Sequence, residues 1–97
     1  MLLILRLLAS GPLHGYALAQ RIVLLSGSEL RVEEGSLYPA LQKLLVKGWV
    51  KARPVVSETG RQVREYRITP AGRRQLDAER EKYTRFSTAI RAVLDNA

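Results

Sequence analysis

Polar and basic side chains share one face of a short segment near the middle of the chain. They can donate hydrogen bonds or bring positive charge, and none is acidic: Ser36, Tyr38, Gln42, Lys43 and Lys47. The opposite face repeats leucine at helical spacing: Leu37, Leu41, Leu44 and Leu45. A short helix that is apolar behind and basic in front has the shape that enters the major groove of DNA.

We expect this helix to begin near Ser36, because Pro39 lacks an N–H and fits only within a first turn. Gly48 is expected to end it, since glycine commonly follows the last residue of a helix. Within the helix, we expect Gln42 and Lys43 to reach base edges, where lysine prefers guanine and glutamine prefers adenine.

Positive charge gathers in the stretch that follows this helix. The 97 residues include 16 Lys and Arg against 9 Asp and Glu, for a net charge of +7, and residues 49–75 alone carry seven basic and two acidic side chains. Such an excess favours a polyanionic partner, either nucleic acid or an anionic membrane surface. We interpret Arg61, Arg64 and Arg67, with Arg73 and Arg74 beyond them, as a strip that contacts phosphates. The alternative is a solvated hairpin with incidental arginines.

The residues that catalysis or metal binding would need are missing. The chain has no cysteine, and His14 is its sole histidine, so a transition-metal site would have to be completed by Glu33 and Glu34. Ser36 has no histidine base in its local sequence, and adjacent glutamates point in different directions. We therefore expect no enzyme activity and no cofactor, and a loop or capping role for His14.

The elements that must position these residues begin with two helices. Residues 2–9 predict a first helix that is apolar almost all round, which points to a second subunit covering Leu3 and Leu7. The stretch is far short of the roughly 18 apolar residues that a membrane span needs, so we expect a soluble cytoplasmic protein without membrane attachment. A second helix is expected from about His14 to Leu25, with Leu18, Ile22 and Leu25 facing inward.

A hairpin and a long helix complete the chain. Residues 49–56 and 62–69 predict two strands around a turn at 57–60, and Pro54 suits an open edge of such a ribbon. Thr69 and Pro70 form a typical helix start, and nothing breaks a helix from there to Asn96. The prediction is a mainly α fold with a small β-hairpin in two parts, a DNA-binding part at 1–69 with its wing at about 49–69, and a dimerisation helix at 70–97.

The last helix carries a coiled-coil-like seam. Apolar residues fall seven apart or on the intervening positions: Leu76, Tyr83, Phe86, Ile90, Val93 and Ala97. Glu79 sits where an apolar residue would be expected. We favour a dimerisation helix, because the small body leaves too little surface for so long a stripe; the alternative is an amphipathic helix packed on its own domain.

With these elements placed, the sequence resembles the PadR family of transcriptional regulators. The resemblance rests on Leu7-Leu8, on Gly11-Pro12-Leu13-His14-Gly15-Tyr16, on Glu34-Gly35-Ser36-Leu37-Tyr38-Pro39-Ala40-Leu41 with Leu44 and Gly48, and on Arg64, Tyr66-Arg67-Ile68-Thr69 and Ala71-Gly72-Arg73. It implies a winged helix-turn-helix fold, a homodimer built by the first and last helices, and repression of nearby promoters.

The resemblance also implies roles for single residues. Tyr16 would touch phosphate at the start of the second helix, Ser36 and Tyr38 would dock at the groove, and the wing arginines would lie along the DNA backbone. Some members bind a small aromatic or drug-like effector between subunits. Trp49, the only tryptophan, lies at the foot of the wing, so stacking on tryptophan in a central cavity is not expected here.

The sequence thus favours a sequence-specific DNA-binding repressor that acts as a homodimer on an inverted-repeat operator. A different class is a winged-helix interaction module whose basic wing binds an acidic protein. A third is peripheral membrane attachment through the first helix. RNA binding is less expected, because few aromatic side chains are available for base stacking.

Overall fold

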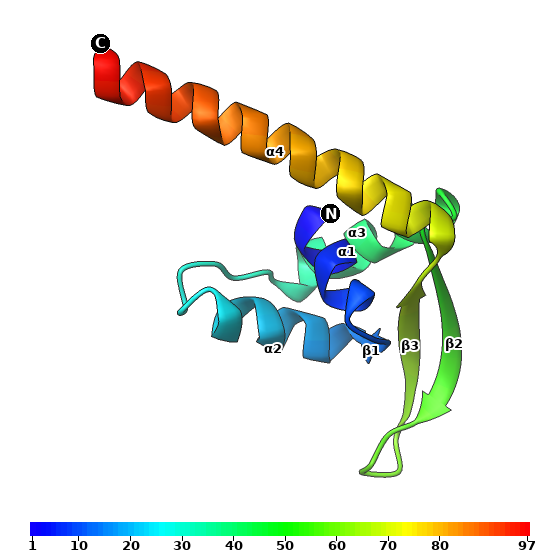
Figure 1. Ribbon diagram of the computed structural model, residues 1–97. Coiled ribbons are helices and arrows are strands. Elements are labelled where there is room, and N and C mark those ends of the chain that lie inside the picture. The colour runs from blue at the N-terminus through cyan, green and yellow to red at the C-terminus, as the bar shows by residue number, and fades with distance from the viewer.

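Four helices and a small antiparallel sheet make up the computed structural model, which describes residues 1–97 (Figure 1). In chain order the elements are α1 (Leu2–Ala9), β1 (Leu13–His14), α2 (Gly15–Leu25), α3 (Glu34–Val46), β2 (Val50–Val56), β3 (Gln62–Ile68) and α4 (Pro70–Asn96). This architecture confirms the predicted class, a mainly α fold with a β-hairpin. No helix has the length and apolar character needed to cross a membrane.

Local capping fixes the start of α4 and the end of α3, as predicted. The Thr69 hydroxyl oxygen accepts a hydrogen bond from the Gly72 amide at 3.1 Å, and Pro70 occupies the first turn of α4. The same hydroxyl donates to the Gly48 carbonyl at 2.7 Å, which ties α4 to the end of α3. There the Gly48 and Trp49 amides donate to the Leu45 and Leu44 carbonyls, each at 3.0 Å, and close the helix.

The start of α3 differs from the prediction by two residues. The helix begins at Glu34 rather than near Ser36, because Glu33 has the extended backbone of a cap and its carbonyl accepts bonds from the Ser36 and Leu37 amides, both at 2.9 Å. Pro39 therefore lies inside the helix, beyond its first turn. Since proline has no N–H, the Gly35 carbonyl loses the donor that a regular helix would supply.

The core lies where the first three helices, the sheet and the start of α4 meet. Its buried apolar side chains are Ile4, Leu5, Leu8, Leu18, Ile22, Leu37, Leu41, Leu44, Val50, Tyr66 and Leu76. The expected inward stripe of α2 is correct for Leu18 and Ile22 but wrong for Leu25, which is 71% exposed. The core reaches Ile22 but not Leu25 at the end of α2, so periodicity alone placed Leu25 incorrectly.

The predicted hairpin is confirmed, and it gains a third strand. β2 pairs with β3 from Val50 opposite Ile68 to Val56 opposite Gln62, and Pro54 lies on β2, an edge of the sheet. The sheet order is β1-β3-β2, because Leu13 and His14 pair with Tyr66 and Glu65. This short strand fixes the start of α2 beside the wing.

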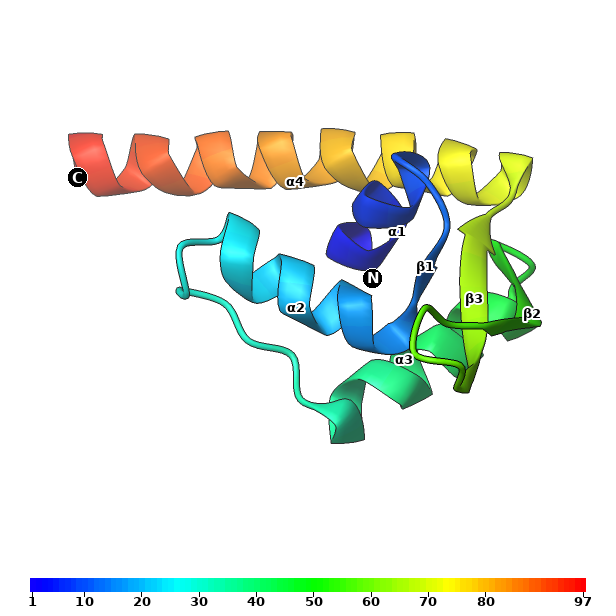
Figure 2. The same ribbon diagram turned by 90° about the horizontal axis from the view of Figure 1, so that it is seen from below.

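The long helix α4 extends well past the rest of the chain. Its first half packs against α1, whereas its last turns extend past every other element in both views (Figures 1 and 2). Every residue from 88 to 97 is exposed. The projecting helix gives the molecule its long dimension, with extents of 56 × 29 × 22 Å.

Candidate nucleic-acid interface

The outward face of α3 carries all five polar residues that the sequence placed there. Ser36, Tyr38, Gln42, Lys43 and Lys47 are exposed. Behind them Leu37, Leu41 and Leu44 are buried in the core and Leu45 is partly buried, and the helix packs against α2 and β2. The Lys47 ammonium lies 5.1 Å from the centroid of the Trp49 ring, a cation–π distance that directs this lysine toward the base of the wing.

A groove joins α3 to the start of α2 and to the wing. It encloses about 310 Å³ and is lined by His14, Gly15, Tyr16, Tyr38, Gln62, Val63, Arg64 and Tyr66. Three of the predicted DNA-contacting residues therefore meet in one place, Tyr16 from α2, Tyr38 from α3 and Arg64 from β3. Tyr16 is 58% exposed and Tyr38 is 45% exposed, so both rings are available to a ligand.

The first turn of α2 supplies a favourable place for an anion. His14 Nδ1 accepts a hydrogen bond from the Ala17 amide at 3.3 Å, which confirms the expected capping role of this histidine. The first amides of a helix have no acceptor within it and carry partial positive charge. Tyr16 belongs to this turn, so its ring stands beside a positive helix end.

The wing keeps most of its positive charge free of internal ion pairs. One salt bridge forms, between Arg53 Nε and Glu65 Oε1 at 3.2 Å. The guanidinium carbon of Arg64 lies 5.9 Å from the centroid of the Tyr66 ring, so the buried tyrosine supports this arginine at the groove. Arg61 is exposed at the hairpin turn and does not line the groove.

The arginines interpreted as one strip form separate clusters. Arg64 lines the groove with Tyr38, whereas Arg67 lines a different hollow with Arg73 beside the residues that follow α1. Successive side chains of a strand point to opposite faces, which separates Arg64 from Arg67. Only the first cluster shares a surface with α3.

The residues assigned to dimerisation divide into two groups. Leu76 is 5% exposed and is covered by its own chain, and Leu7 is partly buried against the same core. Leu3 of α1 and four residues of α4 are exposed: Tyr83, Phe86, Ile90 and Val93. The surface that α4 offers to another molecule therefore begins beyond Leu76, where the helix leaves the body.

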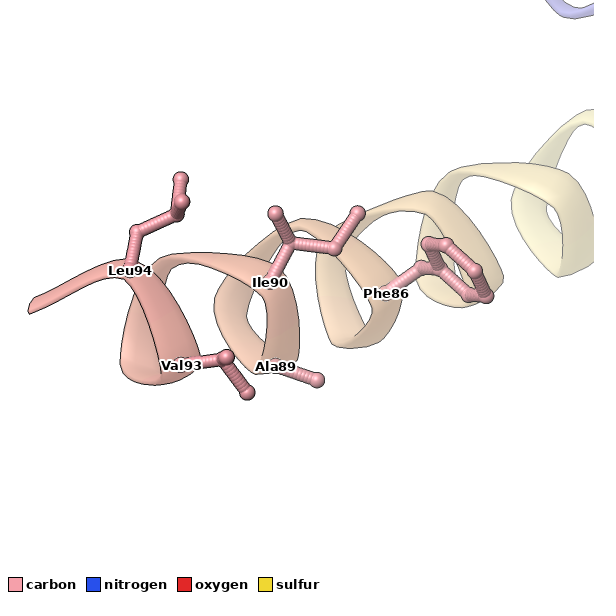
Figure 3. Close-up of a pocket in the computed structure, with 5 residues that line it drawn as sticks. All are labelled: Phe86, Ala89, Ile90, Val93 and Leu94. Atoms are coloured by element: carbon pink, nitrogen blue, oxygen red, sulfur yellow. The ribbon is translucent and has the colours of Figure 1, made fainter. Parts of the chain in front are cut away.

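Two further residues belong to this exposed surface and were missed by the seven-residue spacing. Ala89 and Leu94 line a shallow depression with Phe86, Ile90 and Val93, and Figure 3 shows all five side chains projecting from the last turns of α4. Positions three and four apart on a helix are neighbours, so a search for spacings of three and four would have found both. We call these five residues the apolar row.

The structure contains no cluster of three or more His, Cys, Asp or Glu side chains that could hold a metal ion. His14 is engaged as a helix cap. The chemistry that the surface offers is therefore hydrogen bonding, positive charge and aromatic contact.

Two curated relatives match most of this chain. A transcriptional regulator of Mycobacterium tuberculosis, Rv3488, is 40% identical over 72 residues, which are 74% of this chain and 64% of that protein. An uncharacterised 37.1 kDa protein in transposon Tn4556 of Streptomyces fradiae is 46% identical over 89 residues, 92% of this chain. The chain spans about a quarter of the Streptomyces protein and just under two thirds of Rv3488.

Solved structures share the fold. A transcriptional regulator from Clostridium thermocellum, Cth-833, superposes with a TM-score of 0.85 at 28% identity and covers 93% of this chain and 87% of its own. Bacillus subtilis PadR in complex with operator DNA gives a TM-score of 0.71 at 27% identity, over 79% of this chain and 44% of that one. These likenesses confirm the predicted winged-helix class.

The family model described as the transcriptional regulator PadR-like family matches residues 4–78. This range includes α1, α2, α3, the wing and the start of α4. The family and the solved neighbours are transcriptional regulators and not enzymes. The match covers well over half of the 97 residues, so the chain belongs to the PadR-like family of transcriptional regulators.

Proposed function

We propose that this chain binds double-stranded DNA in a sequence-specific manner and acts in the cytoplasm as a homodimeric repressor. The observation that carries the proposal is the groove in which Tyr16, Tyr38 and Arg64 meet beside the exposed polar face of α3. Three elements that meet at one surface can contact a duplex together, with one helix in the major groove and the others on the DNA backbone. Bacillus subtilis PadR, which resembles this chain, has been solved with operator DNA.

The exposed side chains divide by the part of DNA that suits their chemistry. Arg61, Arg64 and Lys43 neutralise phosphates and supply affinity, while the hydroxyls of Tyr16, Ser36 and Tyr38 donate hydrogen bonds to the backbone. Gln42 and Lys43 lie further along α3 and read base edges, so Lys43 is the one side chain that serves both purposes. Lys47, held near Trp49, contacts the backbone at the end of α3.

The exposed surface of α4 supports the proposed homodimer. A contiguous exposed apolar row on a soluble protein marks an interaction site, and Leu3 and Tyr83 extend it toward the body. A second copy of the chain covers these residues best, because a two-fold axis lets the same row meet itself. Two recognition helices then face an inverted repeat with half-sites about 10 bp apart.

Two substitutions test the assignment of roles on DNA. Arg64→Ala should weaken binding by a similar factor on every duplex and lower the salt slope of log K by about one, because one phosphate contact is lost. Gln42→Ala should instead change the preferred sequence, selected from a random pool, and leave the salt slope unchanged. Arg85→Ala, on α4 and outside the groove, is the matched control.

The dependence of duplex binding on salt concentration also distinguishes a DNA partner from an acidic protein partner. Binding to random duplex should fall steeply between low and moderate salt if phosphates are the target. A native protein that ignores every duplex at low ionic strength would contradict the proposed function.

A further inference from the structure

The first residue of α2 is a glycine whose backbone does not require glycine. Gly15 is absent from the residues with positive φ, and it is buried at the helix start. A Cβ placed there would lie 3.0 Å from Tyr38 Cε1, 3.1 Å from the Tyr38 hydroxyl oxygen and 3.3 Å from Tyr38 Cζ. Glycine at this position is therefore explained by the ring of Tyr38, which occupies the space that a side chain would need.

The ring of Tyr38 occupies the space that the missing side chain of Gly15 leaves open. The ring lies across the first turn of α2, yet the side chain keeps almost half of its surface exposed. Its hydroxyl is held at the junction of α2, α3 and β3, in the groove that Tyr16 and Arg64 also line. An exposed tyrosine without such a support would have other rotamers open to it, and fixing it before binding reduces the entropy lost on binding.

We propose that Gly15 is a positioning residue of the DNA interface and acts through Tyr38. By leaving room for the ring, Gly15 holds the Tyr38 hydroxyl beside the positive end of α2 and the Arg64 guanidinium, so that all three address one stretch of DNA backbone. The proposal rests on the proposed function, since it assigns a role within that interface.

Gly15→Ala is a diagnostic change because the obstacle is the far end of a side chain. The Tyr38 ring has to shift by a few tenths of an ångström to admit a new methyl group, which a flexible side chain can do while the helices stay in place. Alanine is also the better helix former. Stability in urea should therefore be unchanged or higher. Affinity for the preferred duplex, measured by fluorescence anisotropy, should fall about tenfold, the loss of roughly one hydrogen bond to a charged group.

Tyr38→Phe separates positioning of the hydroxyl from a general disturbance of α2. Phenylalanine keeps the ring but has no hydroxyl to misplace, so Tyr38→Phe alone should lose about the same tenfold. Adding Gly15→Ala to Tyr38→Phe should cost no further affinity. A disturbance of the helix would lower affinity by the same factor in both backgrounds.

Each outcome decides the proposal. It is overturned if Gly15→Ala binds as well as the native protein, if Tyr38→Phe keeps full affinity, or if the two substitutions lower affinity independently. The Tyr38→Phe measurement still decides if Gly15→Ala does not fold. Failure of the native protein to bind any duplex would count against the proposed function, and it is distinguishable from these results.

Discussion

Gly72 shows how a single residue can join two elements through its backbone. A Cβ on Gly72 would overlap the Trp49 carbonyl oxygen and lie 2.8 Å from Ile68 Cγ1. That carbonyl cannot easily move, because it accepts a hydrogen bond from the Thr69 amide at 3.0 Å. At Gly15 the neighbour is a side chain that can turn away, whereas at Gly72 it is fixed backbone.

We predict that Gly72→Ala destabilises the fold strongly. Overpacking against backbone forces α4 away from the start of β2, and we expect the free energy of unfolding to fall by about 3 kcal/mol. Urea denaturation at a fixed protein concentration measures the change.

Gly35→Ala is the matched control for this change. Gly35 is also in the first turn of a helix, and a Cβ there meets nothing within 4 Å. An equal loss of stability in both variants would contradict the role given to the Trp49 carbonyl.

The exposure of a single residue was predictable where a local pattern determines which face of its helix it occupies. The leucine spacing of α3 placed Ser36, Tyr38 and Lys43 correctly on the outward face, because the core must cover the leucines. The contact of Gly15 with Tyr38 has no such pattern, since the two residues are far apart in the sequence. Periodicity also gave no way to know that Leu25 would be left uncovered.

The helix α4 carries one charged residue, Glu79, on the face that packs against α1. Glu79 occupies the position in the seam where an apolar residue was expected, and its Oε2 atom is buried without a hydrogen-bond partner. It lines a depression with Met1, Leu2 and Tyr83, where α1 meets α4. A buried polar atom without a partner lowers stability.

Replacing Glu79 with leucine should therefore stabilise the chain. We expect Glu79→Leu to raise the free energy of unfolding by about 1 kcal/mol, the low end of the cost of an unpaired buried polar group. Urea denaturation is again the measurement. Glu81→Leu, at an exposed position of the same helix, should change stability little.

A loss of stability in Glu79→Leu would contradict this expectation. It would mean that the carboxylate is paired with a cation in the assembled protein, because removing one partner of a buried pair is strongly destabilising.

The bounds of the elements were predictable where their ends are capped locally. Thr69 and Pro70 start α4 where expected, and the hairpin turns within 57–60. β1 was missed because two residues carry no alternation, and its strand character exists only through pairing with Tyr66 and Glu65. The start of α3 was misplaced because the rule for proline favours a first turn but does not require it.

At the scale of the whole molecule, charge and apolar surface lie at different places. The exposed residues of α3 and the wing carry the excess positive charge, while residues 76–97 hold four basic and four acidic side chains and the exposed apolar row. Two copies joined through α4 would present two basic surfaces without bringing their charges together. This separation is what a dimer that reads two half-sites requires.

We predict that Ile90→Glu leaves the fold of the chain intact and breaks the dimer. Ile90 lies in the middle of the apolar row and is not part of its own chain's core, so the charge should disrupt only the proposed contact between copies. Mass measurement by light scattering after size exclusion should show a change from dimer to monomer. Affinity for an inverted-repeat duplex should fall by 100-fold or more, on the order of the avidity that two linked sites provide.

Thr88→Glu gives the control that makes this result specific. Thr88 is exposed on α4 and lies on the side of the helix away from Ile90, so it adds the same charge outside the apolar row. It should keep the native mass and the native affinity. If Ile90→Glu stays dimeric while Thr88→Glu does not, the two copies meet through the opposite side of α4, and the two recognition helices have a different spacing on DNA.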